Sequence, residues 1–161
     1  MPKFSDYDQR NYERRHSLAQ SSVRLVIICS LLSPEQISSI LDLQPTSGYR
    51  PGDKLIGSPT DEICQVTIWS LSSVDFVKAG EMSQHLDWMK AQLSAKRTAF
   101  KNLNAQKAKI RLEFLTHEFI PSSMLDIKPD FLLLLGQSGI SLRVASIFHT
   151  DERESKSYDR D

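Results

Sequence analysis

The chain has 161 residues, of which 40% are hydrophobic and 25% are charged, an ordinary balance for one globular domain. This composition excludes collagen-like, low-complexity and wholly disordered chains. Twenty basic and twenty acidic residues cancel to a net charge of zero, so bulk charge favours no class of partner. Two cysteines, Cys29 and Cys64, are too few for a disulfide scaffold. Without an apolar leader or a run of roughly 20 apolar residues, we expect a cytoplasmic protein that does not enter a membrane.

Both ends of the chain are polar. Residues 1–22 and 150–161 hold too few large apolar groups to offset the entropy of ordering them. We therefore expect a flexible N-terminal tail, a flexible C-terminal tail and a single globular domain over residues 23–149.

The globular part opens with a β-branched run, Val23 to Cys29, that is typical of a buried strand. A helix signal follows directly, because Ser33 is a candidate N-cap, Pro34 suits the first helical position and Gln36 completes a capping box. The Gly and Pro content of residues 46–53 then predicts a loop.

The next strand, Cys64 to Leu71, alternates so that Trp69 points to the side opposite Ile68. A single long helix is predicted over Met82 to Asn104. Its buried face carries these residues: Leu86, Met89, Leu93, Phe100 and Leu103.

Two more alternating strands close the core, and their inward side chains are Ile110, Leu112 and Phe114 on one and Leu142, Val144 and Phe148 on the other. Between them Pro129 starts a short helix, Phe131 to Leu135, that Gly136 can cap. The order of elements predicts an α+β, ferredoxin-like sandwich. We expect a four-stranded sheet with three helices, one of them long, and all helices on one face of the sheet.

A series of short motifs resembles a known family. They are Leu32-Ser33-Pro34-Glu35-Gln36-Ile37, Gln44-Pro45-Thr46, Tyr49-Arg50-Pro51-Gly52-Asp53, Thr67-Ile68-Trp69-Ser70-Leu71, His85-Leu86-Asp87-Trp88-Met89 and a final segment from Phe131 to Phe148. In order and spacing, residues 23–148 are similar to the bacterial family catalogued as domain of unknown function 4279. The chain departs from the family's usual pattern at Asp42, where a glycine is commoner.

The resemblance implies no enzymatic activity. Some members of the family look like immunity proteins that neutralise secreted toxins, so the resemblance implies protein binding. On matching positions it makes Gly52 and Trp69 candidate site residues and gives Pro34 a structural role.

The outer face of the predicted sheet is the first candidate binding surface. No nucleophile elbow, phosphate-binding loop, dinucleotide fingerprint or metal-ligand spacing occurs in the sequence. The alternation places Trp69 with Arg24, Arg111, Arg143 and Glu113 on the side opposite the helices, beside apolar residues. Arginines around a tryptophan are typical of protein-binding hot spots. The alternative is that the long helix or a terminal tail covers this face, which would make Trp69 ordinary core.

Two other segments are candidates. Lys90, Arg97 and Lys101 fall on one stripe of the predicted long helix, within a run from Lys90 to Arg111 that has seven bases and no acid; such a stripe contacts phosphate or forms a solvated face. The loop with Tyr49, Arg50 and Gly52 could present a cation and backbone amides to a ligand, although turn chemistry alone explains its composition.

Two histidines and an arginine, His117, His149 and Arg24, meet at one sheet end if the last two core strands run parallel and the first strand runs antiparallel to them. We interpret them as solvent-facing residues at strand ends, in preference to an anion or metal site.

From the sequence we therefore expect a non-enzymatic protein-interaction module, immunity-like in neutralising a toxin, with no cofactor and no metal. The alternatives are a small-ligand or anion-binding domain that uses the loop from Tyr49 to Asp53 beside Trp69, and a nucleic-acid binder that uses the basic run. The steep salt dependence of phosphate contacts separates the last of these from the first.

Overall fold

A computed structural model describes residues 22–56, 62–78, 81–117 and 126–147 of the chain. In it, a five-stranded sheet has the strand order β2-β3-β1-β4-β5. The strands are β1 (Ser22–Cys29), β2 (Ser47–Tyr49), β3 (Thr67–Ser72), β4 (Lys109–His117) and β5 (Ser141–Ile147). All neighbours are antiparallel except β4 and β5, which are parallel.

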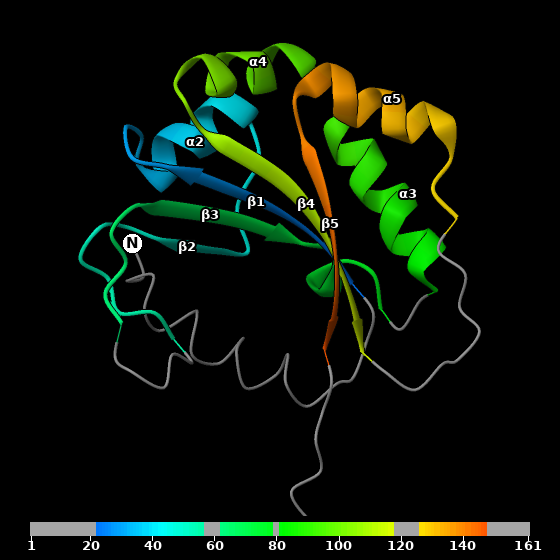
Figure 1. Ribbon diagram of the computed structural model, residues 1–161, viewed down its shortest axis with the longest axis horizontal. Coiled ribbons are helices and arrows are strands. Elements are labelled where there is room, and N and C mark those ends of the chain that lie inside the picture. Colours follow the sequence, from blue (N-terminus) through cyan, green and yellow to red (C-terminus); the bar gives the residue numbers. More distant parts are fainter. Residues whose placement is uncertain (1–21, 57–61, 79–80, 118–125, 148–161) are drawn as a thin grey trace, which may run out of the picture.

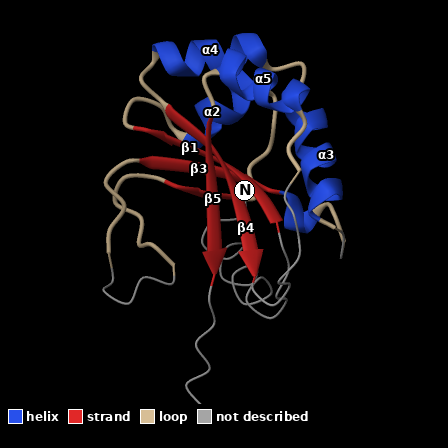
Figure 2. Ribbon diagram, turned by 45° about the vertical axis from the view of Figure 1, so that its right-hand side comes forward, coloured by secondary structure: helices blue, strands red, loops and turns tan. Residues whose placement is uncertain are grey.

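Four α-helices lie within the described residues: α2 (Pro34–Leu41), α3 (Met82–Leu93), α4 (Arg97–Ala105) and α5 (Pro129–Ser138). A short 3-10 turn, η1 (Ser73–Asp75), follows β3. The helices gather on one side of the sheet (Figures 1 and 2). The α+β class is therefore confirmed, whereas the expected count of four strands and three helices is wrong.

The chain connects the first four strands through two interleaved units. Strands β1 and β2 are joined by α2 and are parallel, with β3 between them; β3 and β4 are joined through α3 and α4 and are parallel, with β1 between them. This is the split βαβ connection of a ferredoxin-like arrangement. Helix α5 and strand β5 extend it by one unsplit βαβ unit at the β4 edge. The sequence interpretation missed the first of these units, because the residues of β2 were taken as loop.

The N-terminus of α2 forms as the sequence predicts. The Ser33 hydroxyl accepts the Gln36 backbone N–H at 3.3 Å, and the Gln36 side chain accepts the Ser33 N–H at 2.8 Å. At the other end Asp42 adopts a left-handed conformation with φ 50°. Glycine is the residue that takes this conformation without strain, which gives a physical reason for the family's usual glycine there.

The predicted long helix is two helices. Helix α3 ends at Leu93 and α4 begins at Arg97, and the Ser94 hydroxyl donates to the Lys90 carbonyl oxygen at 2.6 Å. Such back-bonding by serine competes with the helical ladder and bends helices. The chain changes direction at this break, and the expected apolar residues stay in the core. All five are buried: Leu86, Met89, Leu93, Phe100 and Leu103.

Gly139, rather than Gly136, caps α5. Helix α5 runs on through Gly136, and Gly139 takes the left-handed cap conformation with φ 66°. A Cβ at Gly139 would meet the Asn104 side chain at 2.5 Å, and that side chain donates to the Ser138 carbonyl oxygen at 2.9 Å. The prediction of a shorter helix capped by Gly136 is therefore wrong, whereas Pro129 does begin the helix.

Trp69 belongs to the core, and its assignment to the open face is wrong. It lies opposite Ile27 on the helix-facing side, is 0% exposed, and donates its indole N–H to the Ser38 hydroxyl at 3.0 Å. Strand β3 begins only at Thr67. Cys64 and Val66, which made the side opposite Trp69 look apolar, therefore lie before the strand. Leu71, two residues after Trp69, is also buried.

The inward side of β4 is confirmed, because Ile110, Leu112 and Phe114 are all buried. On β5 the expectation of burial is wrong: Leu142 and Val144 face the helix side, beside Leu112 and Phe114, but are 39% and 57% exposed. They lie on the outermost strand, where less of the helix layer can cover them.

The predictions for both tails lie outside the described residues, apart from Ser22, which begins β1. No helix in the described ranges has the length and apolar character needed to cross a membrane.

Candidate functional site

One charged cluster occupies the sheet face that points away from the helices. Cross-strand register places Arg24 of β1 and Arg143 of β5 directly beside Glu113 of β4. Arg111 lies two residues before Glu113 on the same strand, hence on the same face. The alternation of these strands therefore brings together three of the arginines that the sequence singled out.

Glu113 is the centre of the cluster. Its Oε2 atom accepts hydrogen bonds from Arg24 Nε at 3.1 Å and Arg24 Nη2 at 2.6 Å. Its Oε1 atom lies 2.6 Å from Arg111 Nε and 3.8 Å from Arg143 Nη1. Neither of these two contacts is a hydrogen bond: Arg111 Nε has no hydrogen-bond partner among the described residues, and Arg143 Nη1 is too distant. Arg24 is thus committed to Glu113, while Arg111 and Arg143 approach it mainly through charge.

Burial differs sharply between the acid and its cations. The Glu113 side chain is 4% exposed, whereas those of Arg24, Arg111 and Arg143 are 37%, 36% and 60% exposed. Three guanidinium groups against one carboxylate leave two positive charges unbalanced within the cluster. Because the anion is buried and the cations reach solvent, this face presents positive charge outward.

Lys109 extends the same face. It precedes Arg111 by two residues on β4, pairs with Ile28 of β1 and is exposed. The sequence interpretation placed Glu113 on this side but omitted it from the site, and it did not consider Lys109 here. The signal that could have found both is the period-two alternation through Arg111. We call the surface formed by Arg24, Lys109, Arg111 and Arg143 around Glu113 the arginine face.

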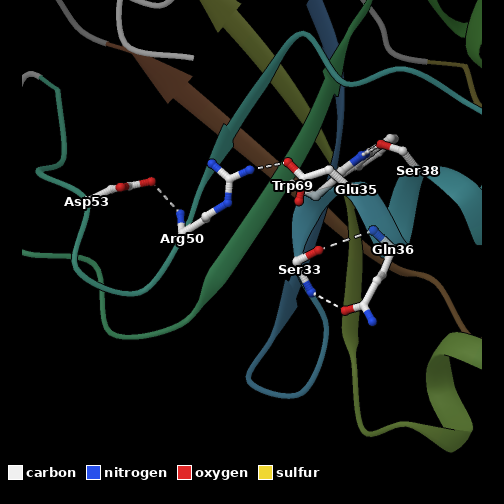
Figure 3. A network of polar contacts seen from close by, with 7 residues as sticks. All are labelled: Ser33, Glu35, Gln36, Ser38, Arg50, Asp53 and Trp69. Atoms are coloured by element: carbon white, nitrogen blue, oxygen red, sulfur yellow. Dashed lines mark hydrogen bonds and ion pairs between the residues drawn. The ribbon is translucent and has the colours of Figure 1, made fainter. Parts of the chain in front are cut away.

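The loop after β2 has a different organisation (Figure 3). Arg50 forms an ion pair with Glu35 in the first turn of α2, and its backbone N–H donates to the Asp53 carboxylate at 2.6 Å. The Gly52 N–H donates to the Cys64 carbonyl oxygen at 2.8 Å, with Gly52 at φ 94°. The hydrogen bonds of a turn and an ion pair to α2 therefore account for the residue types in this loop.

Tyr49 is the last residue of β2 and pairs with Ile68 of β3. Trp69, which the small-ligand alternative places beside this loop, is buried against α2. The structure therefore does not join the predicted loop residues with Trp69 into an open site.

The expected basic stripe is divided by the break between α3 and α4. Lys90 lies on α3 and pairs with Asp130 of α5, whereas Arg97 and Lys101 are exposed on α4. The stripe depended on one continuous helix, so the prediction that these three cations share a face of one helix is wrong. The two α4 cations lie in the helix layer, away from the arginine face.

A buried serine–histidine pair was missed by sequence reasoning. The Ser73 hydroxyl lies 2.7 Å from His85 Nδ1 and accepts the Val23 backbone N–H at 3.0 Å. Both side chains are 0% exposed, and burial lowers the pKa of His85 below its usual value. The pair connects η1, α3 and β1. Because no solvent reaches it, it does not form an open nucleophile–base arrangement.

Metal ligation has no support within the described ranges. They contain no group of three or more His, Cys, Asp or Glu residues able to hold a metal ion. His149 and the side chain of His117, which the sequence placed near Arg24, lie outside the described part of the chain. Cys29 and Cys64 are buried free thiols.

The family described as Domain of unknown function (DUF4279) matches residues 19–149. The chain belongs to this family. The match covers all of the described strands and helices and the whole arginine face. No curated protein and no solved structure matches the chain.

Proposed function

We propose that this chain is a non-enzymatic protein-interaction module that binds an acidic partner through the arginine face. The observation that carries the proposal is the buried carboxylate of Glu113 beneath Arg24, Arg111 and Arg143. Arginine is enriched at binding hot spots, and its planar fork suits carboxylates on a partner.

The arrangement supports binding because the cations are held in place before a partner arrives. Arg24 is fixed by two hydrogen bonds to Glu113, and its neighbours stand on paired strands. Ordering a long side chain on binding costs about 0.5–1.5 kcal/mol. Arg24, whose side chain is already ordered by Glu113, avoids part of this cost.

The charge of the face also suits a partner that must be captured quickly. Complementary charges steer encounter and suppress wrong partners more than they add raw affinity. Within the proposal, the partner is a toxin with an acidic surface, as the resemblance to immunity-like proteins implies. This toxin assignment rests on the resemblance, whereas the charge of the partner rests on the arginine face.

The experiment uses purified candidate partners, beginning with proteins encoded beside the gene of this chain. Calorimetric titration compares the wild type with Arg143→Glu, which reverses an exposed cation of the face. The matched control is Lys101→Glu on α4, which makes the same charge change in the helix layer. We expect Arg143→Glu to weaken binding at least ten-fold and Lys101→Glu to change it less than two-fold.

The reverse pattern would contradict the proposal. A partner whose affinity falls with Lys101→Glu but not with Arg143→Glu binds the helix layer. Steep salt dependence with a nucleic-acid probe, together with loss of binding in Lys101→Glu, would favour the nucleic-acid alternative through α4.

A further inference from the structure

Strand β5 is a long edge of the sheet. It spans seven residues, Ser141–Ile147, and among the described residues it pairs with β4 alone. The opposite edge, β2, has only three residues. An edge strand carries a row of backbone N–H and C=O groups that can pair with another strand. The sequence of β5 contains no proline, one of the devices that blunt such edges.

The side chains of β5 differ between its two faces. Leu142 and Val144 point to the helix side and are 39% and 57% exposed. Arg143, between them, points to the arginine face beside Glu113, and its side chain is 60% exposed. A strand laid along β5 would therefore meet apolar groups on one side and a cation on the other.

We propose that the acidic partner contributes an extended segment that adds to β5 as a further strand. This inference rests on the proposed function and specifies how the partner is held. The segment alternates acidic residues, which lie beside Arg143 on the side of the arginine face, with apolar residues, which cover Leu142 and Val144. Strand addition takes affinity from backbone hydrogen bonds and specificity from alternate side chains.

A second copy of β5 fits this edge less well. Two-fold antiparallel pairing of two β5 strands would bring Arg143 and its symmetry mate onto the same face of the joined sheet. Like charges facing each other across strands are destabilising. An acidic side chain at that position gains a charge complement instead, since the face already holds two unbalanced positive charges.

The test uses the full chain labelled with nitrogen-15 and a seven-residue peptide that alternates valine with glutamate. Titration followed by amide chemical shifts reports both where the peptide binds and how tightly. We expect the largest shifts at the amides of β5, with β2 as the matched control edge. Arg143→Glu should weaken binding at least ten-fold, and it should instead bind a peptide that alternates valine with lysine.

A second peptide tests the backbone component. Methylation of alternate backbone nitrogens keeps every side chain but removes the N–H groups that a strand donates, so this peptide should lose at least ten-fold in affinity. If the methylated peptide binds equally well and remains sensitive to Arg143→Glu, strand addition is overturned while the arginine face survives as an acidic-partner site.

Three further results overturn the inference. One is no shift at millimolar valine–glutamate peptide, and another is binding confined to β2. The third is concentration-dependent self-association of the free chain that the peptide displaces, which would make a second copy the occupant. Arg143→Gln, which removes the charge without reversing it, controls for any loss of folding in Arg143→Glu and should give an intermediate affinity.

Discussion

Replacing Glu113 by glutamine should lower the stability of the protein and raise its affinity for an acidic partner. The substitution keeps the size of the side chain but removes the carboxylate that contacts all three arginines. Hydrogen bonds to charged groups contribute about 1.5–3 kcal/mol, and breaking a fully buried ion pair costs about 3–5 kcal/mol. The arginine side chains here are 36–60% exposed, so water solvates them after the change. We therefore expect a loss of about 2 kcal/mol, near the lower end of these values.

Urea denaturation followed by tryptophan fluorescence measures this loss, because Trp69 is buried in the folded state. Glu62→Gln is the matched control, since Glu62 is exposed and such surface changes stay within about 0.5 kcal/mol. The deficit of Glu113→Gln should shrink at high salt, which screens repulsion among the exposed cations.

The affinity measurement separates electrostatics from packing. In Glu113→Gln the cluster carries three unbalanced positive charges instead of two, so an acidic partner or the valine–glutamate peptide should bind more tightly to the folded variant. A loss of stability below about 0.5 kcal/mol, or a folded variant with weaker binding, would refute this account of the arginine face.

Five other substitutions test the fold. Trp69→Ala should cost about 3–5 kcal/mol in a urea melt, as expected for a fully buried aromatic residue; a loss below about 2 kcal/mol would return Trp69 to the surface. Gly139→Ala should lower the thermal midpoint because φ is positive and its Cβ would meet Asn104, whereas Gly136→Ala, with open space in a helix, should raise stability by up to about 1 kcal/mol; equal effects would contradict the cap assignment. Asp42→Gly should stabilise by about 0.5–1 kcal/mol by relieving a left-handed residue, and a destabilised variant would show that the aspartate itself is needed. Burial lowers the pKa of His85, so as the pH falls the unfolded chain takes up the proton at this histidine before the folded chain does. The contribution of His85 to stability should therefore be constant above about pH 6.5 and fall below it. His85→Gln should remove that part of the dependence of the urea midpoint on pH.

Local signals predicted the elements that depend on local chemistry. The capping box joins Ser33 to Gln36, only three positions further along the chain, and it forms as expected. Strand β1 is apolar at almost every position, and it lies between two neighbours in the sheet with most of its residues buried. By contrast, Ser47–Tyr49 is a three-residue strand with a central glycine. Nothing in such a segment distinguishes a strand from a loop until β3 pairs with it.

Arg24, Arg111 and Arg143 were grouped correctly for a physical reason. Alternation on β1, β4 and β5 requires only that each strand be recognised, and the arginines then fall on one face whatever the strand order. The error with Trp69 had the opposite cause, because deciding which side of β3 is inward required knowing that the strand begins at Thr67. The Ser73–His85 pair joins a turn to a helix through tertiary packing, so no local pattern could have placed it.

A net charge of zero conceals how the charges are distributed in the fold. Two acidic side chains of the helix layer and its connections form ion pairs with cations there: Asp130 pairs with Lys90, and Asp42 pairs with Lys96 at 3.4 Å. On the opposite side of the sheet the sole acid in the cluster is buried, while its cations remain exposed. Burying Glu113 therefore does two things at once: it holds Arg24 in position, and it withdraws the carboxylate of the cluster from the surface that a partner meets. Reversing an exposed cation of this face should consequently affect binding far more than stability, whereas removing the buried anion should affect stability and binding in opposite directions. A merely structural ion-pair network would show the stability effect alone.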